Sequence, residues 1–180
     1  MKGNILFIDT VHPALQYQLE KQNWSCIDGS DWNIEKTLSE IKNFKGIVIR
    51  SRFKLDADFL KQATELKFIA RAGAGMENID VTAADSLGIT CLNAPEGNRN
   101  AVAEHGLGML LALLNNLITA DKEVREGNWF REANRGVEIE GKTIGIVGFG
   151  NTGSAFAKKL SGFDSTILTY DPFTKVDRKK

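Results

Sequence analysis

The sequence predicts an α/β protein whose parallel strands are covered by helices. Two observations support this fold class. In residues 5–92, short runs rich in β-branched residues alternate with helical patterns, which is typical of strands and helices in a parallel sheet. In residues 142–170, a glycine-rich turn joins an apolar strand to an amphipathic helix, and a second apolar strand follows.

The first half of the chain is expected to form a flavodoxin-like domain. Its predicted strands cover residues 5–8, 24–28, 46–49, 68–70 and 89–92. Its predicted helices cover residues 12–22, 34–41, 57–62 and 81–87. We place the end of this domain at residue 97, because residues 93–98 are rich in turn formers and lead into a long helix.

Residues 98–180 are expected to form the front part of a second domain. A long helix over 100–118, a second helix over 119–127 and an irregular arm to residue 136 precede a single strand-helix-strand unit. A dinucleotide-binding sheet needs two βαβαβ halves, and this part supplies less than one. We therefore expect either that the chain is a fragment or that another chain completes its sheet.

The glycine-rich turn has the spacing of a dinucleotide-binding fingerprint. Gly148 is expected to allow the tight turn, Gly150 to let the backbone approach a pyrophosphate, and Gly153 to bring the helix close to the strand. The N–H groups of Asn151 and Thr152 lie at the positive end of the helix, which favours a phosphate. The alternative is a glycine-rich turn that binds no ligand.

Asp171 ends the second strand, about 20 residues after the turn, where the fingerprint has an acidic residue. A carboxylate at this position accepts hydrogen bonds from ribose hydroxyls and repels a 2′-phosphate. The sequence therefore favours NAD over NADP as the cofactor.

Charge and composition exclude several other classes of protein. Lysine plus arginine and aspartate plus glutamate both number 23, so the overall charge favours neither nucleic acid nor a membrane as a partner. The apolar run at residues 5–8 is too short for a signal peptide, and the run at 106–114 is too short to span a bilayer. Two cysteines without a CxxC motif fit packing roles in a reducing cytoplasm.

Four further segments accompany the fingerprint, and together they resemble the D-isomer-specific 2-hydroxyacid dehydrogenase family. These are residues 49–52 (IRSR), 70–80 (ARAGAGMENID), 91–105 (CLNAPEGNRNAVAEH) and 127–131 (GNWFR). The resemblance covers essentially the whole chain and is greatest to the members that act on D-3-phosphoglycerate. It implies a flavodoxin-like substrate domain, residues 1–97, followed by an incomplete Rossmann NAD-binding domain, residues 98–180.

The resemblance implies a substrate site at a loop that follows the fourth strand. Ala72 and Gly73 are expected to hold the substrate carboxylate, and Ala74 and Gly75 to touch the nicotinamide side. The alternative is that these glycines serve only a turn. Asn93 resembles the family asparagine whose amide faces the substrate.

A second group of substrate residues is expected after the third strand. Arg50 and Arg52 flank the hydroxyl of Ser51, and this combination suits a phosphate group. Arg71 is expected to add to the same cationic rim. The alternative is a solvated pair of surface arginines.

No catalytic residue is expected in this chain. The family's histidine base, its paired glutamate and the arginine that polarises the carbonyl would lie beyond Lys180. His105 is interpreted as a packing or interface residue on an apolar helix, and His12 as the start of a helix. We therefore expect the 180 residues alone to be inactive, although the full enzyme would form 3-phosphohydroxypyruvate, the first step of serine synthesis.

The resemblance also implies a homodimer or larger assembly. Residues 102–114 and the pair Trp129 and Phe130 supply an apolar interface, and Arg131 is expected to reach the neighbouring subunit's site. Two other functions stay open. One is a hydroxypyruvate or glyoxylate reductase of the same family, and the other is a non-catalytic, NAD-responsive binding protein.

Overall fold

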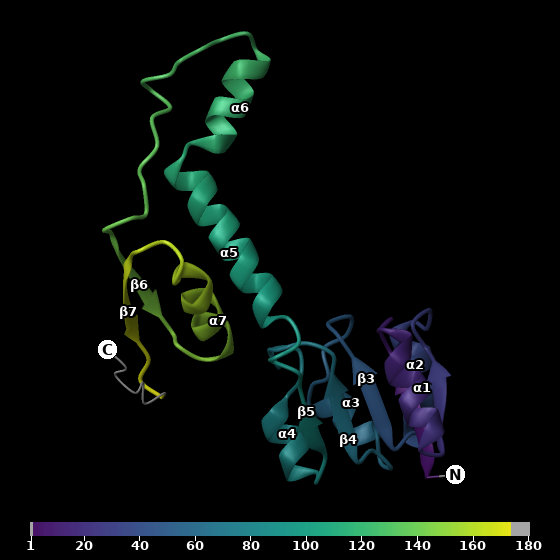
Figure 1. Ribbon diagram of the computed structural model, residues 1–180. Helices are drawn as coiled ribbons and strands as arrows, with labels where there is room; N and C mark the ends of the chain where they lie inside the picture. The colour runs from purple at the N-terminus through teal and green to yellow at the C-terminus, as the bar shows by residue number, and fades with distance from the viewer. Residues whose placement is uncertain (1, 174–180) are drawn as a thin grey trace. The chain divides into compact units, whose positions relative to one another are not determined.

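The structure of this protein is a computed structural model that describes residues 2–173 (Figure 1). The chain forms two compact units, Met1–Gly97 and Asn98–Lys180, which are called unit 1 and unit 2 below.

Unit 1 contains a sheet of five parallel strands in the order β2-β1-β3-β4-β5. The strands are β1 (Gly3–Phe7), β2 (Trp24–Asp28), β3 (Gly46–Ile49), β4 (Phe68–Arg71) and β5 (Thr90–Leu92). This order is that of flavodoxin-like doubly wound sheets, in which the chain changes direction across the sheet between β1 and β3. The predicted α/β fold class with a parallel sheet is confirmed.

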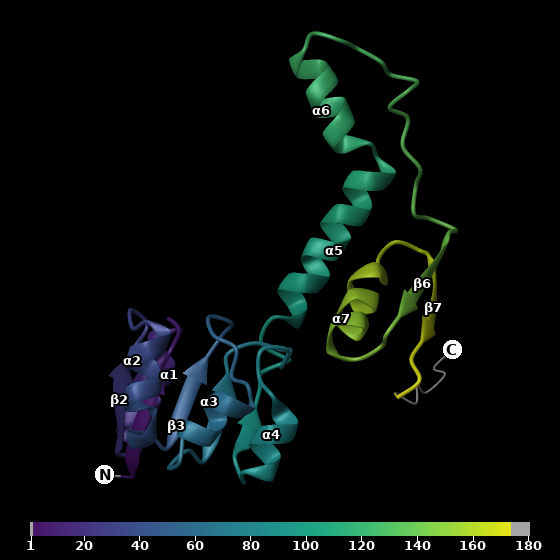
Figure 2. The same ribbon diagram turned by 180° about the vertical axis from the view of Figure 1, so that it is seen from behind.

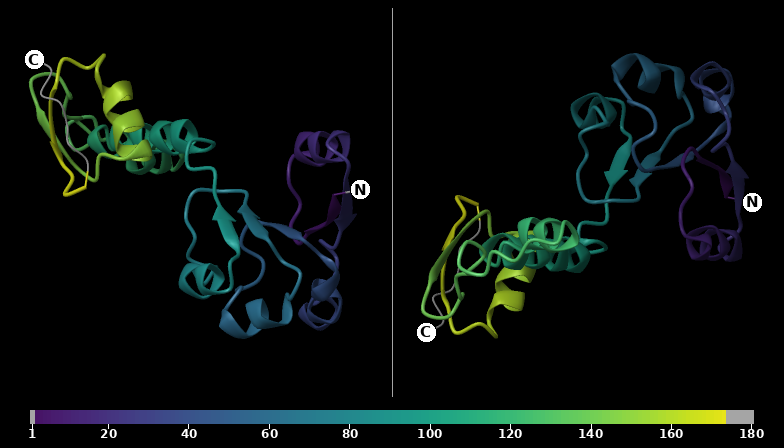
Figure 3. Two further views of the ribbon diagram at one scale, coloured as in Figure 1. Left: turned by 90° about the horizontal axis from the view of Figure 1, so that it is seen from below. Right: turned by 90° about the horizontal axis from the view of Figure 1, so that it is seen from above.

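Helices cover both faces of this sheet. They are α1 (Pro13–Lys21), α2 (Ile34–Glu40), the short 3₁₀ helix η1 (Ile41–Asn43), α3 (Ala57–Gln62) and α4 (Val81–Ser86). Helix α1 lies on one face, and α2, α3 and α4 lie on the other (Figure 3). Ile47 and Ile69 are buried beneath the three helices, and Ile5, Phe7 and Val48 form a smaller cluster beneath α1. Strands buried on both faces have continuous apolar sequences, which explains why they could be located from sequence.

The helices of unit 1 begin at side chains that accept a backbone N–H. Asn33, Asp56 and Asp80 cap α2, α3 and α4 at distances of 2.9, 3.0 and 2.9 Å. These are the residue types that N-caps favour. At α1 the cap is His12, whose Nδ1 accepts from the N–H of Ala14 at 3.2 Å.

The described residues of unit 2, up to residue 173, form three helices and two strands. They are α5 (Arg99–Leu114), α6 (Leu117–Arg125), β6 (Thr143–Val147), α7 (Asn151–Leu160) and β7 (Thr166–Tyr170). The strands are parallel neighbours, and α5 packs beside α7 (Figure 2). Ile146, Ala157 and Leu160 form the buried centre of this unit.

The helix predicted over residues 100–118 is shorter than expected. It ends at Leu114, and a second helix starts at Leu117 in a direction that differs by 60°. Asn116, between them, has a left-handed backbone with φ of 52°. Asparagine tolerates this conformation better than most residues do, so the break falls there rather than after Ile118.

None of the described helices is by itself long and apolar enough to cross a bilayer. The bent pair of α5 and α6 reaches the required length and composition only when the two are counted together.

Candidate functional site

Each of the three fingerprint glycines has a different environment. Gly148 has φ of 91°, in the left-handed region that favours glycine. A Cβ on Gly153 would collide with the carbonyl oxygen of Gly148, so α7 approaches the end of β6 closely at that residue. Gly150 combines a φ of −77° with a ψ of −149°, which lies outside the helical and extended regions, and a Cβ added there would meet nothing within 4 Å. Close packing therefore accounts for Gly153 and a left-handed φ for Gly148, whereas no neighbouring atom of the described chain excludes a side chain at Gly150.

Asp171 fastens the glycine-rich turn to the end of β7. Its Oδ2 accepts the N–H of Phe149 at 2.6 Å, and its Oδ1 accepts the N–H of Phe173 at 2.8 Å. The N–H of Gly148 donates to the carbonyl of Tyr170 at 2.7 Å. The carboxylate therefore lies directly beside the turn, as an acid that contacts a nucleotide bound there must.

An arginine that the sequence interpretation did not include also lies at this turn. Arg99 is the first residue of α5, and Asn151 is the first residue of α7. Nη1 of Arg99 donates to Oδ1 of Asn151 at 3.5 Å. The contact arises because α5 and α7 pack side by side. No spacing in the sequence indicates it, since the two residues are 52 positions apart.

In unit 1, the loop after β3 wraps around the carboxylate of Asp9, which follows β1. Oδ2 of Asp9 accepts the N–H groups of Arg50, Ser51 and Arg52 at 2.7, 3.0 and 3.2 Å. Three successive backbone donors of this kind form an anion-binding concavity. Because the anion here is the carboxylate of Asp9, these three backbone N–H groups are already engaged within the protein and do not face a ligand. The sequence interpretation missed Asp9, although an acid directly after the apolar run 5–8 was a possible signal.

The guanidinium of Arg52 is held by backbone carbonyls. Nη1 donates to the carbonyls of Ile8 at 3.2 Å and Gly29 at 3.3 Å, and also to that of Ser30. Nη2 donates to the carbonyl of Trp32 at 2.7 Å. The sequence predicts that this guanidinium binds a substrate phosphate. In the structure it instead connects the β2–α2 loop to the end of β1 through hydrogen bonds. The exposed guanidinium of Arg50 has no such set of carbonyl partners among the described residues.

The glycine loop after β4 is shaped by two charged side chains. A Cβ on Gly73 would collide with the guanidinium of Arg71, and one on Gly75 with the carboxylate of Glu77. Nε of Arg71 donates to the carbonyl of Arg50 at 3.0 Å, which joins this loop to the loop after β3.

Asn93, which follows β5, fixes the same loop from the other side. Its Nδ2 donates to the carbonyl of Ala74 at 2.6 Å, and the N–H of Ala94 donates to the carbonyl of Gly73 at 2.8 Å. Within the described part of the chain, the N–H groups of Ala74 and Gly75 have no protein acceptor. These two donors are therefore available to an anionic ligand.

An open depression of about 400 Å³ lies where β1, β3 and β4 end. It is lined by Thr10, Val11, His12, Arg50 and Ala72. Ligands of doubly wound sheets bind at the carboxyl ends of the strands where the strand order reverses, and here that point lies between β1 and β3. The depression brings together Arg50 and Ala72, which the sequence interpretation included, and His12, which it set aside.

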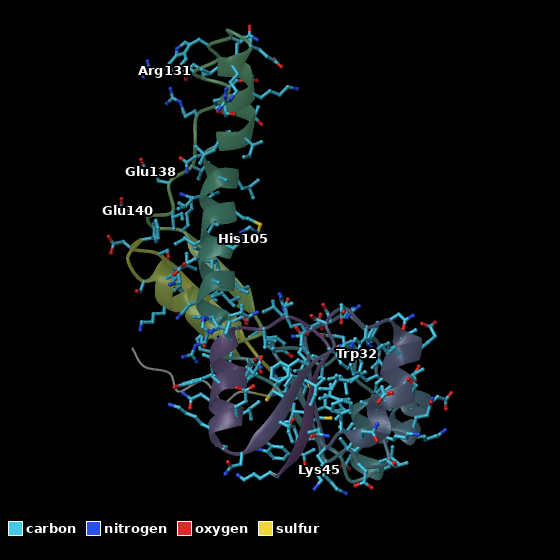
Figure 4. The ribbon with its side chains drawn as sticks, turned by 90° about the vertical axis from the view of Figure 1, so that its right-hand side faces the viewer. Trp32, Lys45, His105, Arg131, Glu138 and Glu140 are labelled. Carbon is cyan, nitrogen blue, oxygen red and sulfur yellow. The ribbon has the colours of Figure 1, made fainter. Side chains whose placement is uncertain are left out.

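Two residues singled out in the sequence lie outside the glycine-rich turn of unit 2. His105 is exposed on α5, and Arg131 lies near the end of α6 that is remote from the glycine-rich turn (Figure 4).

Cys26 and Cys91 are partly buried, and burial raises the pKa of each thiol. Within residues 2–173, no group of three or more histidine, cysteine, aspartate or glutamate side chains is arranged to hold a metal ion.

Comparison with known proteins places this geometry in a family. Residues 5–173 match the model of the D-isomer specific 2-hydroxyacid dehydrogenase catalytic domain. D-3-phosphoglycerate dehydrogenase of Archaeoglobus fulgidus is 40% identical over 144 residues, which are 80% of this chain and 27% of that protein. The enzyme of the same name from Mycobacterium bovis is 36% identical over 177 residues, which are 97% of this chain and 33% of that protein.

The solved structure of NAD⁺-bound 3-phosphoglycerate dehydrogenase from Entamoeba histolytica is similar in fold. Its TM-score is 0.75 at 30% identity, and the match covers 98% of this chain and 56% of that one. The chain thus spans a third or less of the length of the two curated relatives. The match over residues 5–173 confirms the family predicted from the sequence motifs: the chain belongs to the D-isomer-specific 2-hydroxyacid dehydrogenases.

Proposed function

We propose that this chain is part of an NAD-dependent dehydrogenase that oxidises D-3-phosphoglycerate to 3-phosphohydroxypyruvate. In this proposal unit 1 binds the substrate and unit 2 supplies the first part of the cofactor site. Two relatives that carry the name D-3-phosphoglycerate dehydrogenase, at 40% and 36% identity, support the choice of substrate.

The observation that carries the cofactor assignment is the environment of Gly150. A Cβ on Gly150 would meet no neighbour within 4 Å, so no contact within the described chain excludes a side chain there. A pyrophosphate lying against the backbone at the start of α7 would require glycine, because a side chain would occupy the phosphate's place. The neighbouring residues Asn151 and Thr152 would then donate their N–H groups.

The position of Asp171 supports NAD rather than NADP. Its carboxylate lies beside the turn through the N–H of Phe149, where a second phosphate on the ribose would be repelled. NAD supplies the hydride acceptor of the reaction when bound. The residues of this chain hold its adenosine side and exclude the phosphorylated form.

The substrate would bind at the carboxyl ends of the strands of unit 1. The sequence predicts that Ala72 and Gly73 hold the carboxylate, but their N–H groups donate to the carbonyls of Ile49 and Arg71. The N–H groups of Ala74 and Gly75 would therefore receive the carboxylate, in the loop that Arg71 and Asn93 hold in place. The guanidinium of Arg50 would receive the phosphate, since the guanidinium of Arg52 already has carbonyl partners.

The engagement of Arg52 also favours a second candidate. A clamp in which only Arg50 keeps its guanidinium free of backbone carbonyls fits an unphosphorylated 2-hydroxy acid better than two such arginines would. The chain would then belong to a hydroxypyruvate or glyoxylate reductase, and activity on the two kinds of acid decides between these candidates.

We further infer a homodimer in a reducing cytoplasm. Leu113, Ile118 and Trp129 are each at least 75% exposed on the surface of α5, α6 and the following arm, which is unusual for apolar side chains of a monomer. Arg131, close by in sequence, would then act at the partner's site. The two free thiols fit the same compartment.

The cofactor site is tested by alanine at Gly150 and at Gly153 in the full-length protein. We expect Gly150→Ala to weaken NADH binding at least about tenfold, measured by titration calorimetry, and to lower the melting temperature less than Gly153→Ala does, because its Cβ meets no neighbour. Gly153→Ala is the matched control: its Cβ collides with the turn, so it should cost about 1–3 kcal/mol of folding stability as well as binding.

Unchanged NADH affinity in Gly150→Ala would contradict the placement of the pyrophosphate. The substrate assignment is checked on the parent protein by the rate of NAD reduction with D-3-phosphoglycerate and with D-glycerate. A preference for D-glycerate would favour the second candidate.

A further inference from the structure

We propose that His12 is a substrate-binding and specificity-determining residue, which donates its Nε2–H to the phosphate of the substrate beside Arg50. The inference rests on the proposed function and extends it to a residue outside the motifs that identify the family. Its basis is the open depression between β1, β3 and β4, of which both His12 and Arg50 form walls.

The hydrogen bond at the start of α1 fixes the tautomer of the imidazole. Nδ1 accepts the N–H of Ala14 at 3.2 Å, so it carries a lone pair and not a proton. The proton of the neutral ring therefore lies on Nε2, the nitrogen that is not used by the cap. The cap thus makes the ring a hydrogen-bond donor held at the rim of the depression.

The residue type itself indicates a role beyond capping. The three other sheet-packed helices of unit 1 begin at Asn33, Asp56 and Asp80, which are preferred N-caps. Histidine is not among the preferred caps, and a smaller side chain would cap α1 as well. An imidazole places its second nitrogen farther from the backbone than a smaller cap would, and His12 is one of the residues that line the depression.

The charges around the depression favour an anion. Arg50 contributes an exposed guanidinium, and Thr10 contributes a hydroxyl. Asp9 and Asp28 line a smaller hollow that shares His12 with the depression. The charge of Asp9 is balanced by the three backbone N–H groups that its Oδ2 accepts. A phosphate would therefore meet donors from β1, β3 and α1 at one place, while the donors of Ala74 and Gly75 serve the carboxylate.

The test compares substitutions at His12 in the full-length protein. His12→Asn keeps a side-chain oxygen that caps α1 but removes the ring donor, whereas His12→Ala removes both. We expect both substitutions to lower the ratio of kcat/KM for D-3-phosphoglycerate to kcat/KM for D-glycerate by about tenfold, the effect of losing one hydrogen bond to a charged group. Asn33→Ala, which removes only the cap of α2, is the control and should keep the parent ratio.

A ratio that His12→Asn leaves unchanged would overturn the proposal, and so would an equal change in Asn33→Ala. A second measurement separates this inference from the proposed function. The NMR signals of the His12 ring, identified by their absence in His12→Asn, are followed during titration with D-3-phosphoglycerate and with D-glycerate. A shift with the phosphorylated acid alone supports a phosphate contact at His12 even if turnover favours another acid. The absence of that shift overturns the contact even if the dehydrogenase activity is as proposed.

Discussion

The two units use the same succession of strand, helix and strand, but they bury their strands differently. In unit 1, Ile47 and Ile49 of β3 are fully buried, because neighbouring strands flank β3 and helices cover both faces. In unit 2, exposed residues alternate along each strand with partly buried ones, and only Ile146 of β6 is buried. Val147, Leu168 and Tyr170 are 87%, 59% and 66% exposed on the face turned away from α7.

The difference shows what a parallel sheet needs beyond its local sequence. The strands of both units are apolar on both faces, as is typical of strands covered on both sides. Only unit 1 supplies the second layer and enough neighbouring strands from its own residues. A two-stranded sheet with one uncovered face is at best marginally stable by itself, so the units should differ in autonomy.

The largest expected effect is the difference in folding between the separated units. Residues 1–97 should fold cooperatively when produced alone, because their apolar cores lie within the unit. Residues 98–180 should not, because the outer face of β6 and β7 has no cover among the described residues of the unit. Urea unfolding followed by circular dichroism measures both. Cooperative unfolding of residues 98–180 would remove the contrast.

A smaller effect is expected from truncating one apolar residue in each sheet. Ile47→Ala, in the fully buried strand, should cost about 2–5 kcal/mol of unfolding free energy. Leu168→Ala, on the exposed face, should change it by less than about 0.5 kcal/mol. Both are measured by urea denaturation of the protein that contains both units. A large loss in Leu168→Ala would mean that something covers that face in solution.

The smallest effect concerns the two arginines at the sheet edge of unit 1. Arg52→Ala should cost about 1–3 kcal/mol, because it leaves the carbonyls of the β2–α2 loop without their donor. Arg50→Ala should leave stability unchanged within about 0.5 kcal/mol, since the guanidinium of Arg50, unlike that of Arg52, holds no set of backbone carbonyls among the described residues. Melting curves of the two variants provide the comparison. Equal losses would contradict the division between an anchoring and a ligand-facing arginine.

Local sequence patterns were enough to locate most elements and the cofactor turn. The apolar runs predicted β1 to β7 closely, and turn-forming residues marked the division near residue 97. The close approach at Gly153 also follows from the fingerprint, since it depends on residues a few positions apart. The helix break at Asn116 was missed, because one left-handed residue interrupts a pattern that is apolar on both sides.

The sequence by itself therefore determined the fold class and the family motifs. Only the tertiary structure decided what each side chain in those motifs does. In the structure, the guanidinium of Arg52 donates to carbonyls 20 to 44 positions away, and the backbone N–H groups of residues 50–52 donate to Asp9. His12 and Arg50 line the same depression. The physical reason is that hydrogen-bond partners are set by distances between strand ends, and strands adjacent in a parallel sheet are far apart along the chain.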